Sequence, residues 1–444
     1  MPTAAPAAPP GPRQRTSLSL LGDRRRDPIG MFERLRRDHG DVVAFRMGPL
    51  RMFLVTDPDL VQAVLTTEAG AFRKGRILEG ARAILGDGLL TSEGDHHRRQ
   101  RRLVQPAFTA ERIAAYAGLM AAAADRAAAG WAPGAELDAQ SEMTGLTMAI
   151  VAETLFGADV ASDRRRVEAA LARVFRYLDL LVLPFAGLRT RLPTATVRGF
   201  RDARAELDDV VEGIIAARRA SGAEAGDLLS LLLAARDADG GGGMRDAEVR
   251  DEVMTLFAAG LETTANALTF AWWLLGRHPD AEARLHREVD ALAGPPGAGD
   301  LDRLPFTLAV LNEAIRLYPP AWMIARRAVR DVTLGPYRVP EGGLVMMPPY
   351  LLHRDPVRWP DAARFVPERW LPGAPGPAHR FSWLPFGGGT RKCIGAHFAT
   401  MEGTLVLAAV SRRRRLVPLV PDIALQPQIT LRMRGGLPCR VEPR

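Results

Sequence analysis

One cysteine in this sequence stands in a setting that could make it a metal-binding thiolate. Cys393 follows three consecutive glycines, Gly387 to Gly389, and precedes Gly395 at the start of a helical stretch. Glycines let the backbone take positive φ values and approach a flat ligand closely, and free N–H groups at a helix start stabilise a sulfur anion. The three glycines alone would equally fit a plain turn with an ordinary cysteine.

A second group with chemical potential lies in the middle of a predicted helix. Gly260, Thr263 and Thr264 are poor helix formers, so their presence there needs a reason. A small residue lets a cofactor or dioxygen approach the helix, and a threonine hydroxyl can bond to the carbonyl one turn back or open the helix locally. For this helix taken alone, two threonines packed in a core are an equally good explanation.

Charged residues at helical spacing give two further candidates. Glu313 and Arg316 are three residues apart, so they can pair on one helical face. His97 precedes Arg101 by four residues in a strongly basic stretch. Both patterns are also common on solvated helices, so neither indicates a site by itself.

The elements that must position these residues are mostly helices. No proline occurs between Pro193 and Pro279, and apolar residues recur there every three or four positions, which predicts helices joined by loops. Met244 to Arg277 is predicted to be one long helix that crosses the molecule, well above the mean helix length of about 11 to 12 residues. Further helices are expected at 31–39, 57–66 and 395–411, and strands at 42–47, 52–55, 337–339, 344–347 and 429–431.

Composition sets the class of protein. The chain has 444 residues, 47% of them apolar, and a formal charge of +8. Its basic residues are scattered and no nucleic-acid-binding motif accompanies them, so we expect no nucleic-acid partner. Two cysteines make no disulfide framework and suit a cytoplasmic protein, with Cys439 as a structural residue. We expect no signal peptide and no transmembrane segment, a flexible tail over residues 1–20, and a single domain over 21–444.

The Cys393 segment resembles the haem-binding loop of the cytochrome P450 family. In that family Phe, Gly, a basic residue, Cys and Gly recur at the spacing of Phe386, Gly389, Arg391, Cys393 and Gly395. Phe398, Ala399 and Glu402 fit the continuation of the motif. The resemblance extends from about Leu21 to Val441 and includes five segments in the family's order. It implies a mainly α fold with small β-sheets, and a long central helix over a haem b whose iron takes Cys393 as its axial ligand.

The same resemblance implies roles for further residues. Glu262 and Thr263 would be the catalytic acid-alcohol pair that steers protons, with Glu where many members carry Asp. The residues implied to bind the cofactor are Cys393, His97, Arg101, Arg326, Arg391, Phe386 and Gly260. His97 stands where many relatives have Trp, and Arg327 is an alternative to Arg326. Glu313, Arg316 and Arg369 would form a buried structural network behind the thiolate.

The implied activity is that of a monooxygenase. It would insert one oxygen atom from dioxygen into an apolar small molecule, by hydroxylation, epoxidation or several oxidation steps, in bacterial specialised metabolism of terpenoids, polyketides or fatty-acyl compounds. A peroxide-driven fatty-acid peroxygenase and a non-catalytic haem sensor are the alternatives. We expect a monomer that receives electrons from a ferredoxin and its reductase, with Arg391, Lys392 and the run Arg412 to Arg415 as a basic docking face or, for the run, a solvated helix end.

The resemblance also indicates where a substrate would lie. The implied contact segments are mostly apolar; they are 73–90, 175–184, 194–201, 256–264, 322–324 and 429–431.

Overall fold

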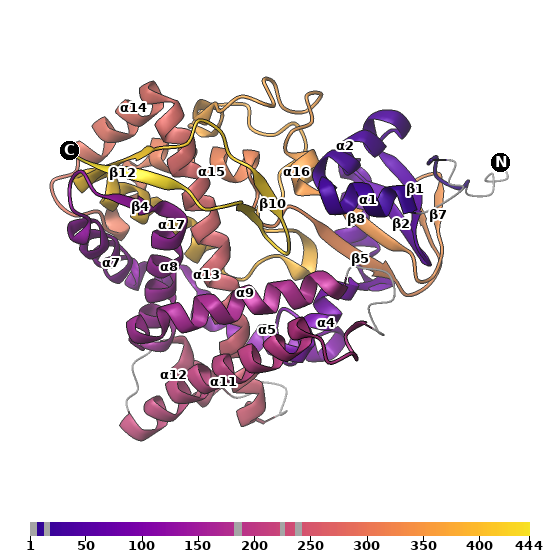
Figure 1. Cartoon of the computed structure of the whole chain (residues 1–444), viewed down its shortest axis with the longest axis horizontal. Coiled ribbons are helices and arrows are strands. Elements are labelled where there is room, and N and C mark those ends of the chain that lie inside the picture. Colours follow the sequence, from indigo (N-terminus) through magenta and orange to yellow (C-terminus); the bar gives the residue numbers. More distant parts are fainter. Residues whose placement is uncertain (1–6, 13–17, 182–188, 223–226, 236–241) are drawn as a thin grey trace.

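The computed structural model describes residues 7–12, 18–181, 189–222, 227–235 and 242–444, and helices dominate it (Figure 1). The α-helices are α1 Leu18–Arg26, α2 Pro28–His39, α3 Pro58–Gln62, α4 Arg76–Leu85, α5 Gly94–Val104, α6 Ala110–Ala115, α7 Ala117–Gly130, α8 Ala139–Phe156, α9 Arg164–Leu181, α11 Ala195–Ser221, α12 Leu228–Ala234, α13 Asp246–Arg277, α14 Pro279–Asp290, α15 Pro305–Leu317, α16 Pro349–Leu352 and α17 Ala396–Arg413. The predicted fold class, mainly α with small sheets, is confirmed.

Strands form small sheets at the edges of this helical body. They are β1 Val42–Met47, β2 Leu50–Val55, β3 Phe72–Lys74, β4 Glu136–Asp138, β5 Ile324–Ala328, β6 Val332–Leu334, β7 Tyr337–Val339, β8 Leu344–Met347, β9 Arg414–Pro418, β10 Leu425–Pro427, β11 Leu431–Met433 and β12 Pro438–Pro443. The largest sheet has the order β1-β2-β8-β5-β3, and β2 pairs with β8 in parallel. Segments from the two ends of the chain therefore lie side by side.

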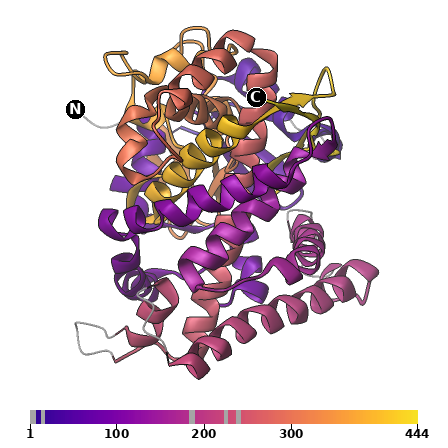
Figure 2. The same cartoon turned by 90° about the vertical axis from the view of Figure 1, so that its left-hand side faces the viewer.

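The long helix α13 crosses the middle of the molecule, as predicted (Figure 1). The Glu248 carboxylate accepts the Arg245 backbone N–H at 2.8 Å and caps its start, and the chain leaves the helix before Pro279. Helices α8, α15 and α17 pack against it, and the Thr147 hydroxyl of α8 donates to the Leu261 carbonyl at 2.8 Å. In Figure 2 the yellow α17 lies against the purple α7. The centre of α13 is thus held from several sides.

Three local predictions need correction. Residues 7–12 are not a free tail, because the Ala7 N–H donates to the Pro336 carbonyl and the Pro10 carbonyl accepts the Ala44 N–H, both at 2.8 Å. The helix predicted at 57–66 is α3 followed by a π-helical turn over Ala63–Thr67. The strand predicted at 429–431 begins at Leu431, because residues 428–430 make the tight turn between β10 and β11.

None of the helices in the described ranges is long and apolar enough to cross a membrane.

Candidate active site

The loop that carries Cys393 is shaped by its glycines. Gly387 and Gly389 have φ values of +68° and +67°, a region that side chains rarely adopt. A Cβ on Gly389 would lie 1.8 Å from the Leu65 carbonyl oxygen, so only glycine lets the loop touch the π-helical turn. The Cys393 N–H donates to the Phe386 carbonyl at 2.9 Å and closes the loop. Phe386 contributes through its backbone here, and its side chain is half-buried.

The thiol of Cys393 is accessible even though protein surrounds it. Its residue surface is exposed, while the dense surroundings raise the pKa of the thiol by burial. The Gly395 N–H, Arg101 and Lys392 act in the opposite direction and favour the thiolate. A cysteine thiolate is one of the axial ligands that proteins provide to a haem iron.

The middle of α13 also presents a small, accessible residue, but it is not the predicted one. A Cβ on Gly260 would lie 2.9 Å from a methyl group of Val151 on α8. Gly260 is therefore needed for helix packing, and our expectation that this glycine serves the cofactor is not supported by its surroundings. Ala259 is exposed in this otherwise buried part of the helix, so Ala259 is the small residue that a flat group could approach.

Glu262 and Thr263 are neighbours in the chain with different partners. The Thr263 hydroxyl donates to the Ala259 carbonyl at 2.9 Å, one turn back. Glu262 is buried, and its Oε1 lies 3.4 Å from Nη1 of Arg432 on β11. Burial raises the pKa of Glu262, and Arg432, Thr430 and Asn266 partly offset this. Sequence reasoning missed Arg432, because nothing in the chain marks that β11 lies beside α13.

Basic residues from three separate segments gather at the Cys393 loop. His97 and Arg101 come from α5, Arg326 from β5 and Arg391 from the loop itself. Arg391 donates to the Ser92 carbonyl at 2.9 Å and pairs with Glu93, and Arg101 donates to the Lys392 carbonyl at 2.8 Å. Burial and the neighbouring cations lower the pKa of His97 to about 3. The predicted residues are thus brought together.

Lys74 is a member of this cluster that sequence reasoning missed. It is buried, and its Nζ donates to the carbonyls of Leu89 and Ser92 at 3.0 and 2.8 Å. Burial, Arg391 and Arg326 lower the pKa of Lys74 to about 7, and Glu93 partly offsets this. No pattern in the sequence marks it, because it ends a three-residue strand, Phe72–Lys74, that also contains Arg73.

The register of the sheet places two of these cations directly opposite each other. Lys74 of β3 pairs with Arg326 of β5, and like charges opposite each other destabilise a sheet. Burial and Arg391 lower the pKa of Arg326 to about 10. The neighbouring Arg327 instead forms an ion pair with Glu79 at 2.8 Å, which favours Arg326 over its alternative. An excess of sheltered positive charge fits the two propionates of a haem.

The predicted structural network is present behind the loop. Arg316 donates to both carboxylate oxygens of Glu313, at 2.8 and 2.7 Å, and Arg369 donates to Oε1 at 3.1 Å. Trp370 adds a bond to Oε2 at 2.8 Å. His353, whose carbonyl accepts from Arg316, receives the Leu384 N–H at 2.8 Å and so links the network to the loop.

Some of the predicted substrate segments come together. The Trp322 indole N–H donates to the Gln428 carbonyl at 2.8 Å, which places the segment 322–324 beside the residue that precedes the segment 429–431. Tyr177 and Phe200 stack at 3.9 Å between α9 and α11, beside a cavity of about 500 Å³ that also involves Arg204 and Asp208. Residues 182–184 of the segment 175–184 lie outside the described residues.

The run Arg412 to Arg415 is engaged within the protein. Arg412 donates to the carbonyls of Val289 and Leu292, Arg413 pairs with Asp125, Arg414 donates to the Trp131 carbonyl, and Arg415 pairs with Glu282 and Glu442. The four side chains are therefore engaged within the protein, although Arg413 at the end of α17 stays exposed, and the docking role of the run remains a prediction.

Comparisons with known proteins agree with this geometry. The family model described as "Cytochrome P450" matches residues 9–427. "Cyclooctatin synthase" and "Cyclooctat-9-en-7-ol 5-monooxygenase" of Streptomyces melanosporofaciens are 43% and 40% identical to this chain, and each alignment covers 91% of this chain and 89% of the relative. "Pentalenene oxygenase" of Streptomyces avermitilis is 40% identical over 88% of this chain and 87% of its own length.

A solved structure shows the same fold. The crystal structure of the haem domain of cytochrome P450DA superposes with a TM-score of 0.87 at 27% identity and covers 99% of this chain and 98% of that chain. Together with the thiolate loop and the cations beside it, these matches show that the chain belongs to the cytochrome P450 family of haem b-dependent monooxygenases.

Proposed function

We propose that this monooxygenase oxidises an apolar terpenoid, with Cys393 as the axial ligand of the haem iron. The relatives at 40% identity or more include enzymes named for pentalenene and for cyclooctat-9-en-7-ol, which supports this substrate class. The observation that carries the haem assignment is the accessible thiol of Cys393 beside the opposed cations Lys74 and Arg326.

The side chains divide the work around the cofactor. Once bound, haem supplies the dioxygen chemistry. Lys74, His97, Arg326 and Arg391 would hold its propionates, while Arg101 fixes the loop that carries Cys393 through the Lys392 carbonyl. Thr263 and Glu262 act as the proton-handling pair, since the Thr263 hydroxyl lies on the turn that exposes Ala259 and Glu262 is a buried acid.

Electrons come from separate proteins in this proposal, a ferredoxin and its reductase. We further infer a monomer that works in the reducing cytoplasm, and the presence of two free cysteines, Cys393 and Cys439, supports this compartment.

The first test is the carbon monoxide difference spectrum of the reduced protein. The parent is expected to show the band of a thiolate-ligated haem, and Cys393→Ser to lose it. Cys439→Ser is the matched control, because Cys439 is buried in the β4-β12-β9 sheet and its replacement should leave the band in place. A Cys393→Ser protein that keeps the parent spectrum would refute the ligand assignment.

The second test is turnover on a panel of terpene hydrocarbons and alcohols. With NADPH, a bacterial ferredoxin and its reductase, oxygenated product should form together with substrate-dependent NADPH consumption. Product formed with hydrogen peroxide alone, and not with the ferredoxin system, would make the chain a peroxygenase. Binding without any product would favour a sensor.

A further inference from the structure

The loop of residues 86–93, between α4 and α5, is held between α13 and the cation cluster. On the cluster side, Lys74 donates to the carbonyls of Leu89 and Ser92, and Arg391 donates to the Ser92 carbonyl and pairs with Glu93. The loop therefore borders the space between the proposed propionate ligands and α13.

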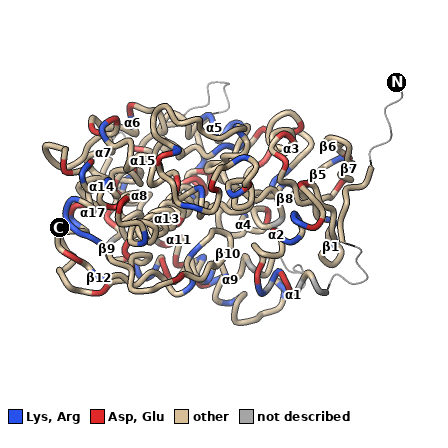
Figure 3. The backbone as a smooth tube through the Cα atoms, turned by 90° about the horizontal axis from the view of Figure 1, so that it is seen from above, with Lys and Arg blue, Asp and Glu red and all other residues tan. Residues whose placement is uncertain are grey.

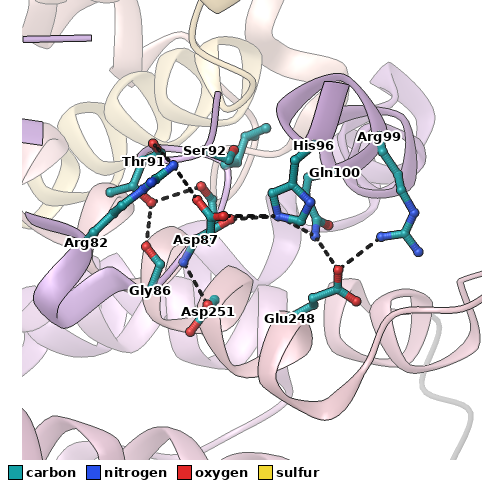
Figure 4. A network of polar contacts seen from close by, with 12 residues as sticks. Arg82, Gly86, Asp87, Thr91, Ser92, His96, Arg99, Gln100, Glu248 and Asp251 are labelled. Atoms are coloured by element: carbon teal, nitrogen blue, oxygen red, sulfur yellow. Dashed lines mark hydrogen bonds and ion pairs between the residues drawn. The ribbon is translucent and has the colours of Figure 1, made fainter. Parts of the chain in front are cut away.

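On the helix side, two carboxylates receive backbone N–H groups of the loop. Asp251 accepts the Asp87 N–H at 2.8 Å, and Glu252 accepts the Leu89 N–H at 3.1 Å. Figure 4 shows this contact around Asp87 and Asp251, together with His96, Gln100 and Glu248 on its other flank. Carboxylate side chains of the helix thus hold the backbone of the loop by hydrogen bonds, in addition to any apolar packing.

Two glycines of the loop show how closely it lies on the helix. A Cβ on Gly86 would lie 2.0 Å from the Asp251 carboxylate, and a Cβ on Gly88 would lie 2.4 Å from the Thr255 hydroxyl. Gly86 also has a φ of +60°. Side chains at either position would push the loop off α13.

Glu252 differs from Asp251 in its burial. Its side chain is fully buried, and among the described residues Oε1 has no hydrogen-bond partner. Burial raises the pKa of Glu252 to about 7, although the Leu89 N–H and Lys74 oppose the shift. A buried carboxyl group with an unpaired oxygen costs stability. We therefore infer that its hydrogen bond with the Leu89 N–H serves to position the loop.

The position of Leu89 connects this residue to the active site. The same peptide segment is fixed twice, by Glu252 at its N–H and by Lys74 at its carbonyl. The next side chain, Leu90, is exposed to 37% although it is a large apolar residue. Glu252 lies eight residues before Gly260, which is about 12 Å along the helix.

We propose that Glu252 is a positioning residue, which through the Leu89 amide sets where the 86–93 loop stands as a wall of the substrate pocket. The pocket itself rests on the proposed haem site, but the contact between loop and helix does not. Loss of the carboxylate should release the loop without removing the thiolate ligand.

Hydrogen exchange measured by mass spectrometry tests the contact in the full chain. Exchange in residues 86–93 should be at least about tenfold faster in Glu252→Ala than in the parent, because local opening sets the rate. Glu252→Gln keeps an acceptor oxygen for the Leu89 N–H and should restore slow exchange. Glu282→Gln is the control, since Glu282 is also buried but lies on α14 and pairs with Arg415. Equal exchange in parent and Glu252→Ala would overturn the proposal.

Azole binding tests the consequence for the pocket. Imidazole needs only the iron, whereas econazole also fills the space around it. The Kd for econazole should change about tenfold in Glu252→Ala and less than about twofold in Glu252→Gln, with the Kd for imidazole unchanged in both. Equal changes for both azoles would contradict a role in the pocket wall. If the parent bound no haem, the proposed function would fail, and the exchange result would still decide whether Glu252 fixes the loop.

Discussion

Glu402 is a buried acid whose pKa is shifted mainly by one cause, its burial. It lies on α17, nine residues after Cys393, and is fully buried. Burial raises its pKa to about 8, and the Thr264 hydroxyl of α13 offsets this only in part. At neutral pH the side chain is therefore mostly a neutral acid. The family motif marked this position in the sequence, but its environment follows only from the packing of α17 on α13.

This residue predicts how stability depends on pH. Because the folded pKa is above the unfolded value, the folded state holds the proton between about pH 4.5 and 8, and its stability falls as pH rises through that window. Each pKa unit is worth about 1.4 kcal/mol. The free energy of unfolding of Glu402→Gln, measured with urea, should therefore rise relative to the parent by roughly 4 kcal/mol between pH 5 and 9. Glu111→Gln, on exposed α6, should run parallel to the parent, and parallel behaviour of Glu402→Gln would refute the prediction.

At the scale of elements, the Glu313 network joins α15 to the residues that lead into the Cys393 loop. Arg316 is fully buried and also donates to the carbonyls of His353, Ala362 and Arg364. Removing Glu313 would leave this guanidinium buried without its counter-ion. The network therefore holds together elements that are far apart in the chain.

We expect Glu313→Ala to lower the free energy of unfolding by about 3 to 5 kcal/mol and to reduce haem retention during purification. The exposed pair of Arg284 and Glu368 provides the comparison, and Arg284→Ala should change stability by less than about 1 kcal/mol. Similar losses of unfolding free energy in the two variants would show that the buried network stabilises the fold no more than an exposed ion pair does. Urea unfolding followed by tryptophan fluorescence measures both.

Some elements could be predicted from the sequence and others could not. The 3.6-residue pattern predicted α13, and the local residue pattern predicted strands at 42–47 and 52–55, which are β1 and most of β2, because both depend on neighbours in the chain. Lys74 and Arg432 were missed, since their positions depend on sheet register and on packing between segments more than 150 residues apart. The need for glycine at position 260 in helix packing was also missed, because the sequence does not show that Val151 of α8 lies where a Cβ on Gly260 would be.

At the scale of the whole molecule, basic and acidic positions are interspersed along the tube in Figure 3, so among the described residues the net charge of +8 is not gathered in one segment. Lys392 is nevertheless exposed beside Cys393. Arg413 is exposed too, but it is paired with Asp125, so Lys392 is the residue on which we test the docking hypothesis.

Lys392→Glu should slow reduction by a bacterial ferredoxin about tenfold at low ionic strength, because it reverses a charge at the proposed docking face. The difference should shrink as salt is added. Arg51→Glu makes the same change of charge at an exposed position of β2 and should leave the rate unaltered. Stopped-flow reduction under carbon monoxide measures both, and equal slowing would place docking elsewhere.

The parallel pairing of β2 with β8 also bears on how the chain matures on the ribosome. Met52 finds its partner Leu344 only after 292 further residues have been made, which takes roughly 15 to 60 s at typical rates of synthesis. Until then β2 keeps one unpaired edge, open to pairing with another nascent chain. Expression yield should therefore depend on chaperones that shield this edge.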